Sequence, residues 1–311
     1  MSSNFKILIT DTLAKEALDL FLTRSNFDVQ YFPGISEQNL FEKVKDTSGL
    51  IIRTATQVSK DLLDHAPKLE LVCRAGIGLD NIDIEECQLR NITVLNTPRG
   101  NRVSTAEHAM GLIFSLARQI PQADFALKNG RWEREKYTGI EIESKKLGII
   151  GLGNIGSLVA KKALGLGMKV TAHDPFISPN VAKELNITLV NLQDILKESD
   201  FITLHVPLTS LTADIVNLEF LSKMKKTSYL INTSRGKVVN ERDLLKTLEL
   251  GLLAGAALDV FAEEPLSKNN PLCKSNKIIL TPHTAGQTKE SLVKISQECA
   301  NQVIIFFTSK A

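Results

Sequence analysis

The sequence has little net charge, and this excludes several classes of protein. Its 311 residues carry 37 Lys and Arg against 35 Asp and Glu, a formal net charge of +2, with no block of five like charges. Nucleic acids and membrane surfaces attract concentrated positive charge, so we expect neither as a partner. No apolar run approaches the ~18 residues of a membrane span. The N-terminal MSSNFKILITDTLAKEA also lacks the basic and apolar regions of a signal peptide.

Cysteines are few, and their spacing indicates no redox or metal chemistry. The four cysteines form no CxxC pair and stand at Cys73, Cys87, Cys273 and Cys299. We expect reduced thiols that serve as small apolar side chains, and no metal site. These absences together predict a cytoplasmic protein.

Short apolar runs alternate with helical patterns along most of the chain. The first series of predicted strands covers 6–10, 28–32, 49–54, 69–76 and 92–98. A second series covers 147–151, 168–174, 187–190, 201–207, 228–234, 253–261 and 277–283. Helical stretches lie between them, as in 13–24, where one face carries Leu13, Ala17, Leu20 and Phe21. This alternation predicts an α/β protein with two doubly wound parallel sheets.

The segment between the two series is predicted to be a helix. Ser104 and Glu107 have the S-x-x-E spacing of a capping box, which predicts a helix start at Ser104. Apolar residues then recur at the spacing of a buried helix face, at Met110, Ile113, Phe114 and Ala117. Pro121 is expected to disturb or end this helix. A last helix is expected over 288–308, with one face formed by Leu292, Ile295, Cys299 and Val303.

A glycine-rich loop follows the first strand of the second series. Gly151-x-Gly153-x-x-Gly156 stands between an apolar strand and a predicted helix, with Asn154 and Ile155 completing the loop. In this context Gly151 permits the turn, Gly153 lets a pyrophosphate approach the backbone, and Gly156 allows close packing of helix on strand. The helix N-terminus favours an anion. The loop therefore predicts dinucleotide binding.

Asp174 ends the next strand, 18 residues after Gly156. A carboxylate there accepts hydrogen bonds from ribose hydroxyls and repels a 2′-phosphate. The following DPFISPN contains no arginine that could bind such a phosphate. NAD is the predicted cofactor. The alternative is that Asp174 caps the helical segment that follows.

Arg235, Glu264 and His283 stand at or after the ends of later strands, where a parallel sheet binds its ligands. Reduction of a 2-oxo acid needs a cation for the carboxylate and a proton donor for the forming alkoxide. A guanidinium and an imidazole paired with a carboxylate supply both. Spacing alone also fits an ordinary surface arginine, loop acid and turn histidine.

The chain also resembles the D-isomer-specific 2-hydroxyacid dehydrogenases, most closely the 3-phosphoglycerate dehydrogenases. The matching stretches follow the family's order and are RAGIGLDNID, NTPRGN, RWEREKYTGIE, LGIIGLGNIG, HDPFISP, INTSRGKVVNE, GAALDVFAEEPL and TPHTAGQTKES. Asn154 stands where many relatives have Arg, and Gln57 where the closest have Lys. Formate dehydrogenases, which are related, carry Gln where this chain has Glu264.

The resemblance implies a flavodoxin-like substrate domain, 1–98 with 285–311, into which a Rossmann-type cofactor domain, 99–284, is inserted. It implies that Arg235 binds the substrate carboxylate and that His283, paired with Glu264, is the acid/base. On the cofactor side it places His205, Val206, Pro207, Thr233, Ser234, Asp259, Ala285 and Gly286. On the substrate side it places Arg53, Arg74, Ala75, Gly76 and Ile77. The helix from Ser104 is expected to help form a homodimer.

The expected substrate pair is 3-phosphoglycerate and 3-phosphohydroxypyruvate. Arg53 and Arg74 are candidate phosphate ligands, and Arg131, Arg134 or Lys136 are candidates across a dimer. All five also fit structural or solvated charge. The chain ends at Ala311, so we expect a short form without the regulatory domain of longer relatives. The alternatives are a glyoxylate/hydroxypyruvate reductase, a broad D-2-hydroxyacid dehydrogenase, and a non-catalytic NAD-sensing protein.

Overall fold

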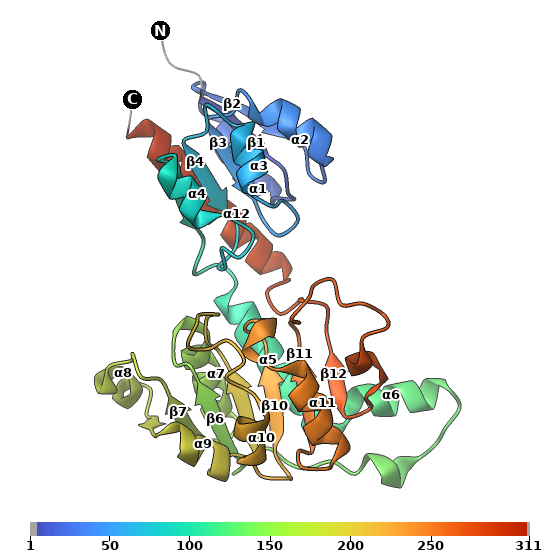
Figure 1. Ribbon diagram of the computed structural model, residues 1–311. Coiled ribbons are helices and arrows are strands. Elements are labelled where there is room, and N and C mark those ends of the chain that lie inside the picture. Colours follow the sequence, from blue (N-terminus) through green and yellow to red (C-terminus); the bar gives the residue numbers. More distant parts are fainter. Residues whose placement is uncertain (1–4, 310–311) are drawn as a thin grey trace. The chain divides into compact units, whose positions relative to one another are not determined.

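The computed structural model describes residues 5–309, and it separates the chain into two compact units. The first unit runs to Asn101 and resumes at Gln287. The second is the continuous segment Arg102–Gly286. Both are parallel α/β structures (Figure 1), which confirms the predicted fold class.

The first unit contains a five-stranded parallel sheet of order β2-β1-β3-β4-β5, the flavodoxin-like order. Its strands are β1 (Phe5–Ile9), β2 (Phe27–Tyr31), β3 (Gly49–Ile52), β4 (Leu71–Arg74) and β5 (Thr93–Asn96). Its helices are α1 (Lys15–Leu22), α2 (Glu37–Val44), α3 (Lys60–Asp64), α4 (Ile84–Leu89) and α12 (Lys289–Thr308).

The second unit contains a seven-stranded parallel sheet of order β12-β11-β10-β9-β6-β7-β8. Its strands are β6 (Lys146–Ile150), β7 (Lys169–His173), β8 (Thr188–Leu189), β9 (Phe201–Leu204), β10 (Tyr229–Asn232), β11 (Gly255–Leu258) and β12 (Ile278–Leu280). Its α-helices are α5 (Arg102–Arg118), α6 (Ile120–Lys128), α7 (Asn154–Gly165), α8 (Pro179–Glu184), α9 (Leu192–Glu198), α10 (Leu218–Ser222) and α11 (Glu241–Glu249). Short 3₁₀ turns are η1 (Arg134–Tyr137), η2 (Gly236–Val238) and η3 (Pro271–Lys274). The direction of strand addition reverses between β6 and β9, as in dinucleotide-binding sheets.

Each sheet is buried on both faces. Successive strand residues point to opposite faces, and in the central strands successive residues are all buried. In β1, Ile7 and Ile9 join one apolar cluster while Leu8 joins the other, and all three are fully buried. In β9, Phe201 and Ile202 separate in the same way. This double burial explains why the strands read as continuous apolar runs.

The C-terminal helix α12 completes the first unit. It packs against α1 and β4, and the predicted apolar face places Ile295, Cys299 and Val303 in the core. Cys73 of β4 and Cys299 are both buried free thiols, with their sulfurs 2.9 Å apart. Residues separated by 226 positions in the sequence therefore share this core.

The predicted start of the central helix is wrong. Helix α5 begins at Arg102 instead of Ser104, and Ser104 lies inside its first turn with 8% exposure. Glu107 pairs with Lys162 of α7 at 2.9 Å instead of closing a capping box. Packing of α5 on α7 has overridden the local capping signal. Pro121 does mark a break, because α5 ends at Arg118 and α6 starts with this proline in its first turn.

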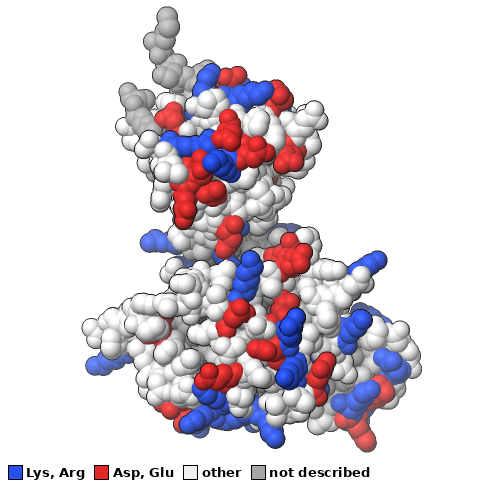
Figure 2. Space-filling model, viewed as in Figure 1, with Lys and Arg blue, Asp and Glu red and all other residues white. Residues whose placement is uncertain are grey.

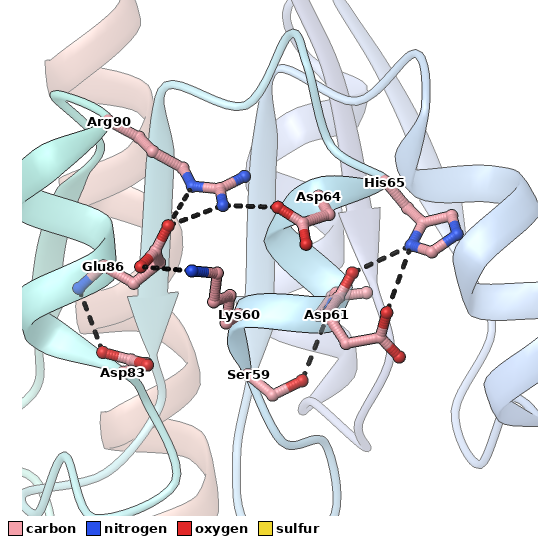
Figure 3. Close-up of polar contacts among 9 residues, drawn as sticks. Ser59, Lys60, Asp61, Asp64, His65, Asp83, Glu86 and Arg90 are labelled. Atoms are coloured by element: carbon pink, nitrogen blue, oxygen red, sulfur yellow. Dashed lines mark hydrogen bonds and ion pairs between the residues drawn. The ribbon is translucent and has the colours of Figure 1, made fainter.

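The surface carries charges of both signs, which are interspersed over the face shown in Figure 2. One network links α3 to α4 in the first unit (Figure 3). Arg90 donates to Glu86 at 2.6 Å and to Asp64 at 2.5 Å, and Lys60 lies 3.9 Å from Glu86. The hydrogen bond from Arg90 lowers the pKa of the Asp64 carboxyl. Asp64 and Lys60 are exposed, and pairs with such exposed partners contribute little stability individually.

None of the helices described within residues 5–309 is both long enough and apolar enough to cross a membrane.

Candidate active site

The glycine loop lies at the carboxyl end of β6, beside the point where the strand order reverses. Gly151 has φ of +91°, and a Cβ there would stand 2.5 Å from the carbonyl oxygen of His205. A Cβ on Gly156 would stand 2.0 Å from the carbonyl oxygen of Gly151. At Gly153, which precedes Asn154 at the start of α7, a Cβ would meet no described atom within 4 Å. Backbone atoms therefore pack tightly around Gly151 and Gly156, whereas the space beside Gly153 is open. A pyrophosphate that binds the loop backbone requires this open space.

Asp174 follows β7 and faces the same loop. Its Oδ2 accepts the amide of Leu152 at 2.8 Å, and Oδ1 accepts that of Phe176 at 2.9 Å. The helix that follows is capped by Ser178, whose hydroxyl accepts the amide of Asn180. The capping alternative for Asp174 is therefore not what the structure shows, and the carboxylate retains lone pairs for ribose hydroxyls.

Two polar atoms near the ends of β9 and β10 are buried without a hydrogen-bond partner among the described residues, namely His205 Nδ1 and Thr233 Oγ1. His205 Nε2 lies 3.0 Å from the hydroxyl of Thr203, and burial lowers the pKa of His205 to about 3. Its imidazole is therefore neutral. Buried polar groups are normally hydrogen-bonded, so these two atoms fit a site that a polar ligand completes. Val206 packs near Gly151, and Pro207 accepts the Thr212 hydroxyl.

Arg235 projects from the turn after β10, and Asn232 shapes that turn. The side chain of Asn232 accepts the amide and the hydroxyl of Ser234 and donates to the carbonyl of Arg235 at 2.9 Å. Gly236 is needed because a Cβ there would stand 1.8 Å from the carbonyl oxygen of Phe261. The arginine turn thus packs directly on the segment that leads from β11 to Glu264.

His283 and Glu264 form the predicted pair. Nδ1 of His283 lies 2.7 Å from Oε2 of Glu264, and Oε1 of Glu264 accepts the amide of Phe261 at 3.0 Å. Burial raises the pKa of the Glu264 carboxyl, but the hydrogen bonds from His283 and Phe261 outweigh it and leave the pKa lowered. The carboxylate is thus charged at neutral pH and accepts the Nδ1 proton of His283. Nε2 is therefore the ring nitrogen that is left to exchange a proton with a substrate.

Asp259 is fully buried after β11, and its carboxylate holds the segment that carries His283. It accepts the amides of Thr284 at 2.9 Å and Ala285 at 2.8 Å, and the hydroxyl of Thr281 at 2.5 Å. Gly286 follows directly. The family resemblance places Asp259 on the cofactor side, and this stays a prediction; in the structure its oxygens accept the hydrogen bonds of this turn.

In the first unit, Arg53 lies in a loop whose backbone is fixed by Asp11. That carboxylate accepts the amides of Arg53 at 2.7 Å, Ala55 at 3.3 Å and Thr56 at 3.4 Å. Nη1 of Arg53 makes only a long contact of 3.4 Å, to the carbonyl of Thr12, and Nε is buried without a partner among the described residues. Burial lowers the pKa of Arg53. A partly desolvated guanidinium with spare donors fits an anion.

Arg74 is more fully engaged. Its Nε donates to the carbonyl of Arg53 at 2.9 Å and Nη1 donates to the carbonyl of Gly78. The adjoining Ala75, Gly76 and Ile77 are fixed by backbone bonds and by Asn96, whose side chain donates to the carbonyl of Ile77 at 2.6 Å. Arg74 therefore shapes the 74–78 loop.

The cations of the 131–136 loop have local partners. Arg131 lies 3.8 Å and Lys136 3.4 Å from Glu133, and Arg134 is exposed in η1. This arrangement matches the solvated-charge alternative for Arg131 and Lys136.

Sequence reasoning missed several residues that organise these loops, namely Asp11, Asn81, His108 and Asn232. Asn232 and Asp11 carried a signal, because each is a polar residue at the end of an apolar strand. Asn81 donates to the carbonyls of Arg53 and Thr56 from a loop, and His108 reaches Thr281 from α5. Local pattern alone does not single out these two.

Comparisons with known proteins agree with this geometry. Residues 110–285 match the family model described as D-isomer specific 2-hydroxyacid dehydrogenase, NAD binding domain, which confirms the predicted cofactor. The chain is 40% identical to D-3-phosphoglycerate dehydrogenase of Synechocystis sp. over 298 residues, 96% of this chain and 53% of that protein. It spans about half the length of the curated relatives it matches.

Solved structures cover the whole fold. A protein from Thermus thermophilus superposes with a TM-score of 0.90 at 30% identity, covering 98% of this chain and 97% of its own. D-lactate dehydrogenase from Aquifex aeolicus, solved with NAD and lactic acid, gives 0.83 at 29% identity, covering 97% and 96%. With its glycine loop, its histidine–glutamate pair and these matches, the chain belongs to the D-isomer specific 2-hydroxyacid dehydrogenase family.

Proposed function

We propose that the protein is an NAD-dependent oxidoreductase that interconverts 3-phosphoglycerate and 3-phosphohydroxypyruvate. The observation that carries the reaction class is the 2.7 Å bond between His283 and Glu264, at the strand edge that also carries the glycine loop. The substrate is supported by 40% identity to relatives named D-3-phosphoglycerate dehydrogenase.

In this proposal, each side chain has one task. Arg235 binds the substrate carboxylate through charge-assisted hydrogen bonds. His283 receives the hydroxyl proton of C2 at Nε2 during oxidation and returns it during reduction, while Glu264 stabilises the protonated ring through Nδ1. NAD held at the glycine loop would supply the hydride acceptor for C2 in oxidation, and NADH the hydride donor in reduction. Gly153 and the start of α7 would hold the pyrophosphate, and Asp174 the ribose.

The first unit is proposed as the substrate domain, with Arg53 as the phosphate ligand. Arg53 is the better candidate because Arg74 already binds two carbonyl groups. A hydrogen bond to a charged group contributes ~1.5–3 kcal/mol. Two bonds from one guanidinium would therefore favour a phosphorylated over an unphosphorylated acid by roughly 10²–10⁴-fold.

The test is NADH oxidation with 3-phosphohydroxypyruvate, hydroxypyruvate, glyoxylate and pyruvate, compared by kcat/KM. A preference of about two decades or more for the phosphorylated acid supports the proposal. Equal or higher rates with the others would establish the glyoxylate/hydroxypyruvate reductase or broad dehydrogenase alternative. Tight NADH binding without turnover of any acid would favour the NAD-sensing alternative.

We also propose a cytoplasmic homodimer. The α5–α6 region and the loop after it expose large apolar side chains, namely Phe114, Ile120, Phe125, Leu127 and Trp132, with Trp132 81% exposed. Exposed apolar side chains gathered on one segment are typical of an interface with a second copy. Light scattering should give twice the chain mass, and Trp132→Glu should shift it toward the monomer. A monomeric mass for the unsubstituted protein would refute the dimer, and cell fractionation tests the location.

A further inference from the structure

The turn that carries His283 is held by one buried residue. His283 has φ of +52°, and its amide donates to the carbonyl of Asp259 at 2.8 Å. The carboxylate of Asp259 accepts the next two amides, those of Thr284 and Ala285. A non-glycine residue in the left-handed region persists only where its surroundings hold it there. The position of the proposed acid/base therefore depends on Asp259.

A second histidine reaches this carboxylate from a helix far away in sequence. Nε2 of His108, on α5, lies 3.1 Å from the hydroxyl oxygen of Thr281 and 3.4 Å from Oδ1 of Asp259. The Thr281 hydroxyl lies 2.5 Å from the same Oδ1. An ionised carboxylate only accepts, so the hydroxyl donates to Asp259 and accepts the Nε2 proton of His108. The three side chains form one polarised chain of hydrogen bonds.

Desolvation makes this support necessary. Asp259 has no exposed surface, and a buried charge is unfavourable unless it is hydrogen-bonded. Burial raises the pKa of the Asp259 carboxyl, but the bonds from His108, Thr281 and the two amides outweigh it and leave the pKa lowered. The side chain of His108 is itself only 24% exposed, so water replaces it poorly.

We propose that His108 is a positioning residue for proton transfer at His283, acting through Thr281 and Asp259. The inference rests on the proposed function. It assigns to α5 a role in the chemistry besides its packing on the sheet. Loss of the Nε2 donor would loosen the turn while leaving the glycine loop intact, so the acid/base would be displaced and the cofactor site would not. Small displacements of a proton donor reduce turnover strongly.

The test compares two substitutions at one position. His108→Leu removes the donor and keeps apolar bulk, whereas His108→Gln keeps an N–H group near the place of Nε2. We expect kcat to fall by about 10- to 100-fold in His108→Leu. The Kd for NADH should stay within about twofold, and His108→Gln should recover most of the loss. Glu107→Gln, one residue away on the exposed side of α5, is the matched control and should retain the parent kcat.

A second readout does not depend on turnover. Hydrogen exchange of the amides of residues 283–285 should accelerate in His108→Leu and not in Glu107→Gln. Thr281→Val should give a similar loss of kcat, and the double variant should lose little more, because both changes break one chain. If no 2-oxo acid is reduced by the unsubstituted protein, the proposed function fails, while the exchange data still decide whether His108 holds the turn. Unchanged kcat and exchange in His108→Leu would overturn the inference, as would a loss that comes with weaker NADH binding and no recovery in His108→Gln.

Discussion

Replacing Glu264 with Gln separates the charge of the proposed acid/base pair from its shape. In the unsubstituted protein, Oε2 lies 2.7 Å from Nδ1 of His283, and the other oxygen accepts the amide of Phe261. Gln keeps that amide contact and can still bond the ring, but it carries no charge. A hydrogen bond to a charged group contributes about 1.5–3 kcal/mol. The variant should therefore stabilise the protonated ring less by about 10- to 150-fold.

The assay is kcat/KM for reduction of 3-phosphohydroxypyruvate at neutral pH, where the Glu264 carboxylate is charged. Reduction needs the proton on the ring, so Glu264→Gln should lower kcat/KM by about 10- to 150-fold. The Kd for NADH should not change. No loss of kcat/KM, or a loss that comes with weaker NADH binding, would refute the reasoning.

The same substitution has a consequence for stability, with a sign set by the lowered pKa of the Glu264 carboxyl. A carboxyl whose pKa is lower in the folded state contributes stability above its unfolded pKa and loses it as the pH falls through the folded one. The Tm difference between the parent and Glu264→Gln should therefore be larger at neutral pH than at about pH 3. The side chain is 35% exposed, so the difference will be modest.

Two further substitutions test the proposed cofactor-binding loop and the proposed phosphate ligand. Gly156→Ala places a Cβ 2.0 Å from a backbone oxygen, so we expect both the NADH affinity and the Tm to fall. The control is Gly165→Ala, on the same helix, where a Cβ meets nothing within 4 Å and the Tm should rise by a few degrees. A change of Tm in the same direction in both variants would contradict the packing argument. Arg53→Ala removes both proposed bonds to the phosphate, so it should raise the KM for 3-phosphohydroxypyruvate by roughly 10²–10⁴-fold with little change for hydroxypyruvate. The surface variant Arg24→Ala should change neither, and equal effects of Arg53→Ala on both acids would show that Arg53 binds no phosphate.

The strands and the two sheets were predictable because the pattern that specifies them is local. Apolar runs such as 147–150 and 201–204 are short, rich in branched residues and bounded by glycine or polar residues, and each became a strand. The glycine loop also located the ligand-binding edge of the second sheet, since it follows the strand at which a dinucleotide-binding sheet reverses its order. Even β8 was predicted, although only two residues of the expected run pair with β7.

Helix boundaries were less predictable where packing competes with local capping. Ser104 and Glu107 have capping-box spacing, yet α5 extends back to Arg102 and buries Ser104. Glu107 gains an ion pair with Lys162 of α7, which is 55 residues away. A contact at that separation leaves no trace in a local pattern, and the packing of α5 on α7 outweighs the cap that it replaces.

The organisation of the site shows the same division between strand ends and long-range contacts. Arg235, Glu264 and His283 could be singled out because each stands at or after the end of a strand of one parallel sheet, and all carboxyl ends of such a sheet meet at one edge. The support of that edge was not predictable in this way, since His108 meets Thr281 across 173 residues of sequence. On α5 it stands among the buried Ala106, Ala109 and Met110, where a histidine is easily taken for part of a helix face. Only the fold shows that this position lies opposite the turn after β12, where His108 meets Thr281 beside the proposed acid/base.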